Sequence, residues 1–486
     1  MNKQEFNIGY NFIGHKFNIS EKKKLEITIK QKFNNNNNNF YLNFFYSYGK
    51  SNKLNIPLPN SWYNYLKNNK FLINYKFSRY LFSLFVIKSF LRSQYFILKN
   101  LFFNNFPKFN KAAIFMNMNN KTFGNPNLTH DIIDQLKSKK IINHDEKIIL
   151  NTNKLIFSKK IKNKYNVTHS IFPRINFLHS VNLLLYNLIV ILQFFIFFFT
   201  NKLEKILILE ELIYLKYYSF LKINKNKFKY FFHHTGMSYK PFWTHFHESN
   251  FENIFIYFYS SNIEGIQFSK KHKYYPHTNF DLLNWKSYIL WDNYQKKYIE
   301  KYNLIQSNYY SLGYINWLGS KKLNLKNNSK YNIAIFDVTP MRVSLYASHG
   351  HCIPLYYSKE IYKRFYKDIN ELYLNFKNIS LYRKPKRKTD NNFIGNNFIS
   401  NIDKKLLKNY TTLDYETSIT DIIKFCQITI CMPFTSPALT AKYLNSKVIF
   451  YDPSNTIDIK TYHGIKIIKT KSSLFNYFKE NLRQKS

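Results

Sequence analysis

The stretch "ITICMPFTSPALTAKYLNSKVIFYD", residues 428–452, differs in composition from the rest of the chain and decides its fold. A β-branched run ends at Pro433, the residues Phe434-Thr435-Ser436 follow, and a second apolar run ends at Tyr451-Asp452. Between them a helix is expected from Pro437, because the N–H that proline lacks would have no partner in the first turn of a helix. A strand, a turn with two hydroxyls, a helix and a second strand together form a unit of a parallel α/β sheet.

The C-terminal part of the chain repeats this alternation. We expect strands at 331–338, 378–384, 427–432, 446–452 and 464–469, and helices at 358–376, 417–425, 437–444 and 472–482. Near-continuous apolar strands that alternate with helices are typical of a parallel sheet covered on both faces. The sequence therefore predicts a Rossmann-like domain over residues 331–486. It contains no G-x-G-x-x-G motif and no P-loop, which argues against ordinary dinucleotide binding and ATP hydrolysis.

A chain of 486 residues is too long for one ordinary core. Residues 1–70, with the run "NNNNNN" at 34–39, are expected to be irregular. Residues 71–319 are expected to form a helix-rich α/β domain, with long helices up to about residue 230 and strands near 230 and 253–265. The polar run 320–330 is the predicted linker to the C-terminal domain.

Two apolar stretches of the N-terminal part each allow two interpretations. Residues 183–200 are long enough to span a bilayer but are interrupted by Asn187 and Gln193, so we expect a core helix, with a membrane span as the alternative. Residues 78–103 place Lys88, Arg92 and Lys99 on one helical face, which favours a half-buried helix or docking at a membrane interface.

The formal charge of +44 accompanies an enrichment in Lys, Asn, Ile, Phe and Tyr and a scarcity of Gly and Pro. This pattern indicates a base-composition bias that accounts for most of the charge. The remainder is a basic surface suited to anionic substrates or lipid headgroups. The cysteines Cys352, Cys426 and Cys431 show neither metal-binding spacing nor a disulfide framework and fit a reducing cytoplasm. The N-terminus carries no apolar signal segment.

Ligands of open α/β sheets bind beyond the carboxyl ends of the strands, and this is where Thr435 and Ser436 are expected. A helix N-terminus offers free N–H groups and a partial positive charge, so it holds phosphates. Two neighbouring hydroxyls can add hydrogen bonds to a phosphate or a sugar. The alternative is that Ser436 only caps the helix.

Six stretches, taken in order, resemble one family. They are "FWTHFHESNFENIFIYFYSSN" (242–262), "WKSYILWDNYQ" (285–295), "IAIFDVTPMR" (333–342), "SLYRKPKR" (380–387), "MPFTSPA" (432–438) and "VIFYDPSN" (448–455). The chain is similar, over roughly residues 225–480, to bacterial polysaccharide-biosynthesis proteins named for their PFTS motif. The resemblance implies two Rossmann-like domains facing a cleft (GT-B-like) and a metal-independent glycosyltransferase activity. Pro437 stands where the family commonly carries another hydroxyl residue, which puts the number of ligand-binding hydroxyls in doubt.

Such an enzyme binds a nucleotide-sugar donor mainly to its C-terminal domain and uses no further cofactor. The predicted donor and phosphate ligands, chosen from the resemblance and from their places at strand ends, are Thr435, Ser436, Arg342, Lys384, Lys386, Arg387, Tyr451 and Asp452. Their alternatives are a basic loop, a salt bridge for Arg342 and a turn-forming role for Asp452. Asp337 is expected to organise the loop after its strand with Thr339 as partner, and Pro433 to shape the turn.

Glu264 and His234 are the candidate catalytic bases, since each follows or ends a predicted strand of the N-terminal domain. A structural role is the alternative for both. His245 and His247 are spaced like zinc ligands, but no third ligand is apparent, so no metal site is predicted.

We therefore expect a cytoplasmic glycosyltransferase of surface polysaccharide or lipopolysaccharide biosynthesis. It would transfer a sugar to a glycan or lipid-linked acceptor, with peripheral contact at the inner face of the membrane and no specific nucleic-acid partner. One alternative is a nucleotide-sugar epimerase on the same fold. The other is a non-catalytic basic protein that binds membrane surfaces or nucleic acid.

Overall fold

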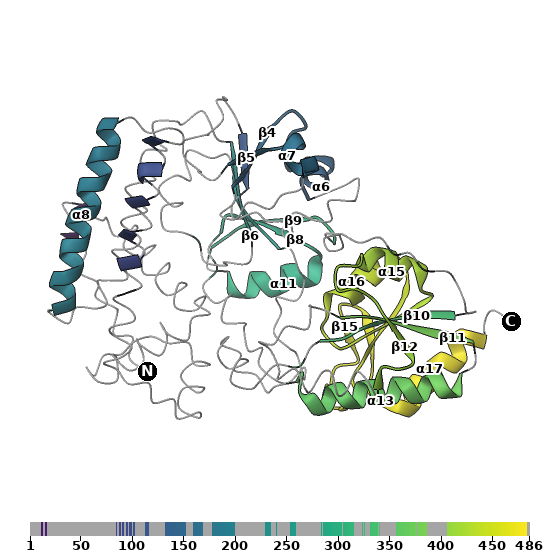
Figure 1. Cartoon of the computed structure of the whole chain (residues 1–486). Coiled ribbons are helices and arrows are strands. Elements are labelled where there is room, and N and C mark those ends of the chain that lie inside the picture. The colour runs from purple at the N-terminus through teal and green to yellow at the C-terminus, as the bar shows by residue number, and fades with distance from the viewer. Residues whose placement is uncertain are drawn as a thin grey trace.

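The computed structural model shows two α/β lobes (Figure 1). The structure describes residues 112–115, 132–151, 159–168, 177–199, 229–234, 253–258, 285–303, 305–314, 331–338, 356–376, 378–385 and 406–483. It also describes scattered residues outside these ranges, among them helical ones between 84 and 102. We call the described residues up to 314 the N-terminal lobe and those from 331 the C-terminal lobe.

The C-terminal lobe is built on a seven-stranded sheet in the order β12-β11-β10-β13-β14-β16-β15. Its strands are β10 (Tyr331–Phe336), β11 (Ile379–Lys384), β12 (Tyr410–Thr412), β13 (Ile428–Cys431), β14 (Lys447–Tyr451), β15 (Thr461–Tyr462) and β16 (Ile465–Ile468). All pairings are parallel except that of β15 with β16. Without the edge strand β15, this is the Rossmann order 3-2-1-4-5-6.

Helices cover both faces of this sheet, as the alternation of side chains along β10 requires. Ile333 and Ile335 belong to one core cluster with the residues of α13 (Lys359–Asn375) and α17 (Lys471–Arg483). Ala334 and Phe336 belong to the other, with α15 (Ile419–Phe425) and α16 (Ser436–Tyr443). Figure 1 shows the two helix layers on opposite sides of the strands.

The seven-stranded sheet of the N-terminal lobe repeats the Rossmann order and continues it with a seventh strand, in the order β5-β4-β3-β6-β7-β8-β9. Every pairing in this sheet is parallel. The strands are β3 (Ala112–Phe115), β4 (Lys147–Asn151), β5 (Asn166–Thr168), β6 (Tyr230–His234), β7 (Asn253–Tyr257), β8 (Ser287–Leu290) and β9 (Asn308–Ser311). The predicted class, two Rossmann-like α/β domains, is confirmed. The expectation of long helices throughout the part before residue 230 is wrong, because β3, β4 and β5 lie there.

The remaining described elements of the N-terminal half are short helices, one long helix and a small sheet. The helices are α6 (Ile132–Ser138), α7 (Lys159–Lys164), α8 (Phe177–Phe199) and α11 (Asn293–Tyr302), and β1 (Asn11–Phe12) pairs with β2 (His15–Lys16). The first sheet ends with β9 and the second begins with β10, on either side of the predicted linker.

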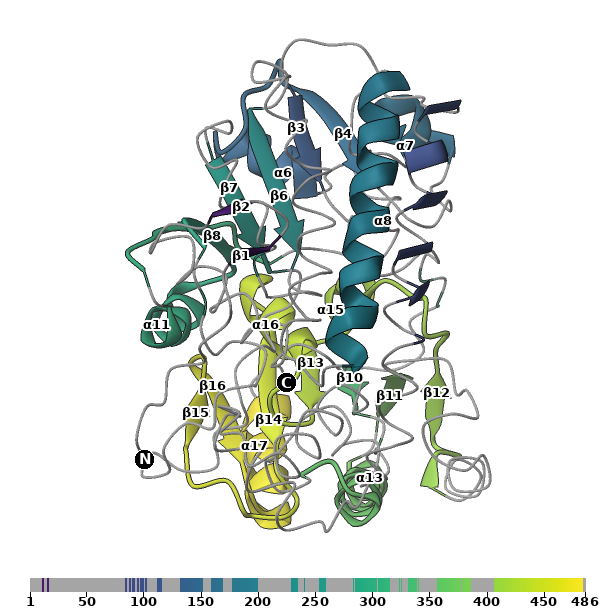
Figure 2. The same ribbon diagram turned by 90° about the vertical axis from the view of Figure 1, so that its left-hand side faces the viewer.

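Helix α8 stands at the edge of the N-terminal lobe and not in its core (Figure 2). Its outer face exposes large apolar side chains, among them Leu192 and Phe199. The expectation of a core helix at 183–200 is therefore wrong. Among the described residues, no helix is long and apolar enough to cross a membrane.

The two lobes touch where β8 ends. The Tyr443 hydroxyl at the end of α16 donates to the carbonyl of Trp291 at 2.8 Å. The His463 ring lies 2.9 Å from a carboxylate oxygen of Asp292, which also caps α11. Because all strands of the first sheet are parallel, their carboxyl ends share this edge, which therefore lies toward the C-terminal lobe.

Candidate functional site

The C-terminal sheet changes direction between β10 and β13, which pair from Ile333↔Ile428 to Phe336↔Cys431. The chain winds outward from β10 through β11 and β12, and in the other direction from β13 through β14 and β16. At such a reversal the two connections leave on opposite faces, which opens a ligand crevice at the carboxyl edge. Asp337 follows β10 at this edge, and residues 432–436 follow β13. The predicted phosphate-binding turn thus lies at the topological switch point.

The turn after β13 holds a bulky residue in an unfavourable backbone conformation. Phe434 has φ of +64°, in the left-handed region that aromatic residues rarely adopt. Its ring packs edge-on against Tyr462, with centroids 4.7 Å apart. The Tyr357 hydroxyl donates to the Pro433 carbonyl at 2.8 Å. Such strain persists only where surrounding contacts determine the conformation, and it is typical of ligand-binding turns. Pro433 has the turn-shaping position that the sequence predicted.

The two adjacent hydroxyls of the turn have different surroundings. Thr435 is 4% exposed and donates its hydroxyl to the Met432 carbonyl at 2.8 Å, so it stabilises the turn. Thr435 is also the N-cap of α16, yet its side chain makes no capping hydrogen bond. Ser436 is the first helical residue, so the alternative that it caps the helix is wrong. It is half-buried, and it is therefore the more exposed residue of the pair.

The uncapped start of α16 contrasts with that of three other helices. The side chains of Asp292, Ser358 and Ser418 accept hydrogen bonds from the first-turn N–H groups of α11, α13 and α15. Thr435, the N-cap residue of α16, accepts no such bond with its side chain. Pro437 has no N–H and the Ala438 N–H bonds the Thr435 carbonyl at 3.3 Å, so this helix start offers an anionic ligand chiefly the positive end of the helix dipole.

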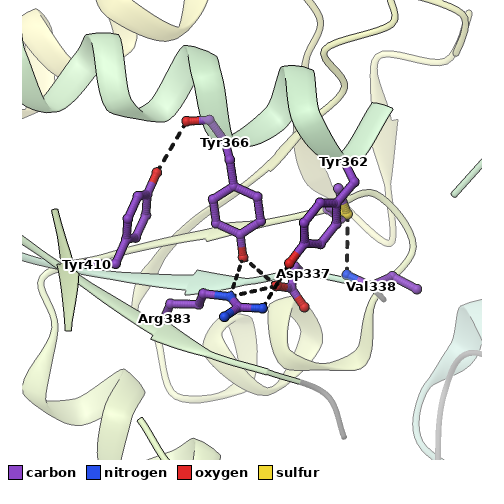
Figure 3. Close-up of polar contacts among 7 residues, drawn as sticks. Asp337, Val338, Tyr362, Tyr366, Arg383 and Tyr410 are labelled. Carbon is purple, nitrogen blue, oxygen red and sulfur yellow. Dashed lines mark hydrogen bonds and ion pairs between the residues drawn. The ribbon is translucent and has the colours of Figure 1, made fainter. Parts of the chain in front are cut away.

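Asp337 forms a buried polar cluster with side chains of β11 and α13 (Figure 3). Its Oδ2 accepts hydrogen bonds from Arg383 Nε at 3.0 Å, from the Tyr362 hydroxyl at 3.3 Å and from the Tyr366 hydroxyl. Arg383 also donates to both tyrosine hydroxyls at 2.8 Å. Burial raises the pKa of Tyr366, so this hydroxyl remains a donor. The cluster fixes the end of β10 against α13.

Thr339, the partner that the sequence predicted for Asp337, lies outside the described residues, so this pairing stays a prediction. The sequence analysis missed Arg383, Tyr362 and Tyr366. Arg383 could have been recognised, because a charged side chain within the apolar strand "ISLYRK" needs a buried partner of opposite charge. Across the end of the strands, the Val338 N–H lies 3.3 Å from the Met432 sulfur, which joins β10 to β13 (Figure 3).

Lys384 follows Arg383 and points to the opposite face of the sheet. It pairs with Phe336, the last residue of β10, so only one strand separates it from β13. At about 4.8 Å per strand, its backbone lies about 10 Å from the end of β13. The side chain is 4% exposed. Burial lowers the pKa of Lys384 to about 8, although Asp337 and Asp414 favour the charged form. The structure therefore brings Lys384, Thr435 and Ser436 to one edge.

Tyr451 and Asp452 also end a strand at this edge, but their polar atoms are used inside the protein. Both side chains are fully buried. The Tyr451 hydroxyl donates to Asp368 on α13 at 2.6 Å. Asp452 accepts hydrogen bonds from the Tyr356 hydroxyl at 2.7 Å and from the backbone N–H of Ile457 at 3.1 Å. These contacts favour the turn-forming alternative for Asp452.

Of the other predicted site residues, the structure describes only the backbone of His234. Arg342, Lys386, Arg387 and Glu264 lie outside the described residues. The backbone of His234 ends β6 at the carboxyl edge of the first sheet, which is the position expected of a cleft residue. The roles of these residues stay predictions. In the described part of the chain, no group of three or more His, Cys, Asp and Glu residues could hold a metal ion.

The lobe contacts lie at the far end of α16 from its tip. Tyr443 is about 10 Å along the helix axis from Ser436. That the N-terminal lobe supplies an acceptor side opposite the tip stays a prediction. A charged hollow on the outer side of α13, lined in part by Lys363, Asp368 and Lys471, belongs to neither edge. Its charges pair with each other, as in the 2.6 Å contact of Lys471 with Glu371.

The protein has two largely parallel sheets in Rossmann order. The carboxyl edge of the second sheet holds the start of α16 and the buried Lys384. The chain is a two-lobed α/β protein with a candidate site for an anionic ligand. Residues 190–478 match the family of polysaccharide biosynthesis PFTS motif proteins, and the chain belongs to this family.

Solved structures share the general arrangement at low similarity, and no curated protein matches the chain in sequence. The UDP-GlcNAc 2-epimerase from Neisseria meningitidis bound to UDP-GlcNAc is 9% identical, with a TM-score of 0.38, covering 77% of this chain and 91% of that one. The glycotransferase of kitacinnamycin is 7% identical with a TM-score of 0.39 and the same coverage. MnaA of S. aureus with UDP is 8% identical with a TM-score of 0.39, covering 77% of this chain and 88% of that one. At TM-scores this low, the similarities carry no conclusion about chemistry.

Proposed function

We propose that the protein is a glycosyltransferase of surface-polysaccharide biosynthesis that binds the phosphates of a nucleotide-sugar donor at the switch point of its C-terminal lobe. The observation that carries the proposal is the convergence of three anion-binding features at one edge. These are the start of α16, which Thr435 does not cap with its side chain, the half-buried Ser436 and the buried Lys384. Membership of the polysaccharide-biosynthesis family supports the same conclusion.

The chemistry asked of these groups is charge neutralisation. When the bond from the anomeric carbon to the donor phosphate breaks, negative charge grows on the leaving nucleoside phosphate. Preorganised N–H groups and a cation stabilise that charge more strongly in a site sheltered from water. Lys384 supplies the cation, and the start of α16 supplies the positive end of its dipole.

The finer parts of the proposal concern acceptor and location. A general base is required if the acceptor hydroxyl attacks directly, and His234 and Glu264 remain the proposed candidates. The acceptor would be a glycan or a lipid-linked sugar at the inner face of the membrane, reached from the cytoplasm by peripheral contact.

Thermal-shift measurements with UDP, GDP, CMP and ADP test the donor site, with Ser436→Ala and Lys384→Met as variants. The matched controls are Ser472→Ala, an exposed serine of α17, and Lys447→Met, an exposed lysine at the amino end of β14. We expect at least one nucleotide to raise the melting temperature of the wild type and of both controls. The same nucleotide should lose about tenfold or more in affinity for each site variant, because each loses a charge-assisted or hydroxyl contact.

Three results would contradict the proposal. In the binding assay, either no nucleotide stabilises the wild type, or the site variants respond like their controls. In the reaction assay, a labelled nucleotide-sugar is returned as the epimeric sugar nucleotide with no transfer to any acceptor, which would identify an epimerase instead.

A further inference from the structure

The exposed face of α8 is a continuous apolar stripe. At 100° per residue, its exposed large apolar side chains fall within about 120° of the helix circumference. They are Phe177, Leu178, Leu185, Leu188, Ile189, Leu192, Phe195, Ile196 and Phe199. The opposite face is buried against the protein through Leu183 and Phe194. A helix on the surface of a water-soluble domain normally turns its apolar stripe inward and its polar stripe outward, so α8 has apolar side chains on both faces.

A second helical segment continues this surface. Residues described between 84 and 102 run alongside α8 in both views (Figures 1 and 2), and Asn187 of α8 donates to Gln94 at 3.3 Å. The exposed positions of this segment also share one face. They are Leu84, Lys88, Leu91, Tyr95, Leu98 and Phe102, all apolar except the lysine. The stripe of α8 alone holds more clustered apolar side chains than scattered surface residues produce, and such patches mark interaction sites.

The charge of the surrounding sequence indicates which partner this surface fits. No Asp or Glu occurs between Glu26 and Asp131, and none between Glu146 and Glu204, although Lys and Arg recur in both stretches. Both helices therefore lie in acid-free, basic sequence, and Lys88 lies within the exposed stripe itself. A second copy of the chain would bring two basic surfaces together, which like-charge repulsion opposes. An anionic bilayer offers acyl chains to the stripe and negative headgroups to the lysines.

We propose that the exposed stripes of α8 and of the 84–102 segment form a membrane-docking surface. The two helices lie in the plane of an anionic bilayer, with their apolar side chains at the boundary of headgroups and acyl chains. The surface deepens the proposed function by bringing the protein to a lipid-linked acceptor. Its binding to lipid is measured without donor or acceptor and stands or falls separately.

Vesicle flotation of the purified full chain tests the proposal. The vesicles contain equal parts phosphatidylglycerol and phosphatidylcholine, or phosphatidylcholine alone. The variant carries Leu192→Glu and Ile196→Glu, which place two charges in the middle of the stripe, where the native side chains are 62% and 57% exposed. The matched control is Leu374→Glu, which changes a 73% exposed leucine of α13 in the other lobe.

We expect the wild type and the control to float with the mixed vesicles. The double variant should bind at least about tenfold more weakly, since each apolar side chain withdrawn from water contributes about that factor. All three proteins should keep the same melting temperature, because the changed residues are exposed. Binding to mixed vesicles should weaken at high salt and exceed binding to phosphatidylcholine alone.

Three outcomes would overturn the proposal. The wild type does not float with the mixed vesicles, or the double variant floats as well as the control. Alternatively, light scattering without lipid shows a dimer that the double variant, but not the control, converts to a monomer. That last result would assign the surface to contact between copies of the chain. If a nucleotide still stabilises the double variant, the donor site is intact, and each of these three outcomes then concerns membrane docking alone.

Discussion

Removing the Arg383 side chain should destabilise the C-terminal lobe while leaving the N-terminal lobe intact. In the native protein, Arg383 Nε lies 3.0 Å from Asp337 Oδ2, and the two side chains are 5% and 1% exposed. Arg383→Leu leaves the carboxylate buried with only tyrosine hydroxyls as partners. Leaving one partner of such a pair uncompensated costs about 3–5 kcal/mol. This is a large part of the total of about 5–15 kcal/mol for an ordinary domain.

The lobes can be followed separately in one urea titration. All five tryptophans precede residue 331, so tryptophan fluorescence reports on the N-terminal part of the chain. Hydrogen exchange of peptides from β10 and β11 reports on the C-terminal lobe. Arg383→Leu should speed the exchange of these peptides and leave the fluorescence transition unchanged. The double variant Asp337→Asn with Arg383→Leu should be at least about 2 kcal/mol more stable than the two single changes predict by addition.

The matched control is Lys471→Leu, which breaks the 2.6 Å contact with Glu371 at the surface. Exposed ion pairs contribute little, so this change should leave the exchange of β10 unaltered. The reasoning is refuted if Arg383→Leu accelerates exchange no more than Lys471→Leu does. Strict additivity of Asp337→Asn and Arg383→Leu would also refute it, since it would show that the two side chains act independently.

Three further perturbations follow from the site and the lobe contact. Lys384→Met should raise the melting temperature at pH 7, because burial lowers the pKa of Lys384 in the folded protein to about 8. The wild type therefore gains stability as the pH rises from about 8 to the pKa of lysine in the unfolded chain, about 10.4. Circular dichroism melts at pH 7 and at pH 10.5 should show that the advantage of the variant disappears. Burial alone would raise the pKa of Asp292, but the hydrogen bond and charge of His463 lower it overall. Asp292→Asn should therefore lower the melting temperature at neutral pH, with a difference from the wild type that narrows as pH falls below the ordinary aspartate pKa of about 3.9. Phe434→Ala should cost about 3 kcal/mol in urea unfolding, because the ring fills the space beside Tyr462, and an unchanged midpoint would show that the turn does not depend on it.

The C-terminal lobe could be predicted from sequence because its strands are continuous apolar runs separated by clear turns. Every predicted strand from 331 onward corresponds to an observed one, and only the short edge strands β12 and β15 were missed. The strands before residue 230 could not be found in the same way. β3, β4 and β5 have three to five residues each, and the Ile, Phe and Asn enrichment of the surrounding chain hides their ends. The same enrichment made α8 look like a core helix, because an apolar stretch has the same pattern whether protein or lipid covers it.

At the site itself, the sequence located the edge but could not divide adjacent residues between two roles. Successive side chains of a strand point to opposite faces, so Arg383 anchors Asp337 while Lys384 turns away toward the α15 side. After the strand ends, the turn makes a similar division: Thr435 is buried and bonds its own loop, and Ser436 is half-buried. A motif read as letters contains both members of each pair and gives no sign of which one a ligand meets. Ser436→Ala and Lys384→Met should therefore impair nucleotide binding at little or no cost in stability. Thr435→Ala and Arg383→Leu should impair stability first, and ligand binding only through it.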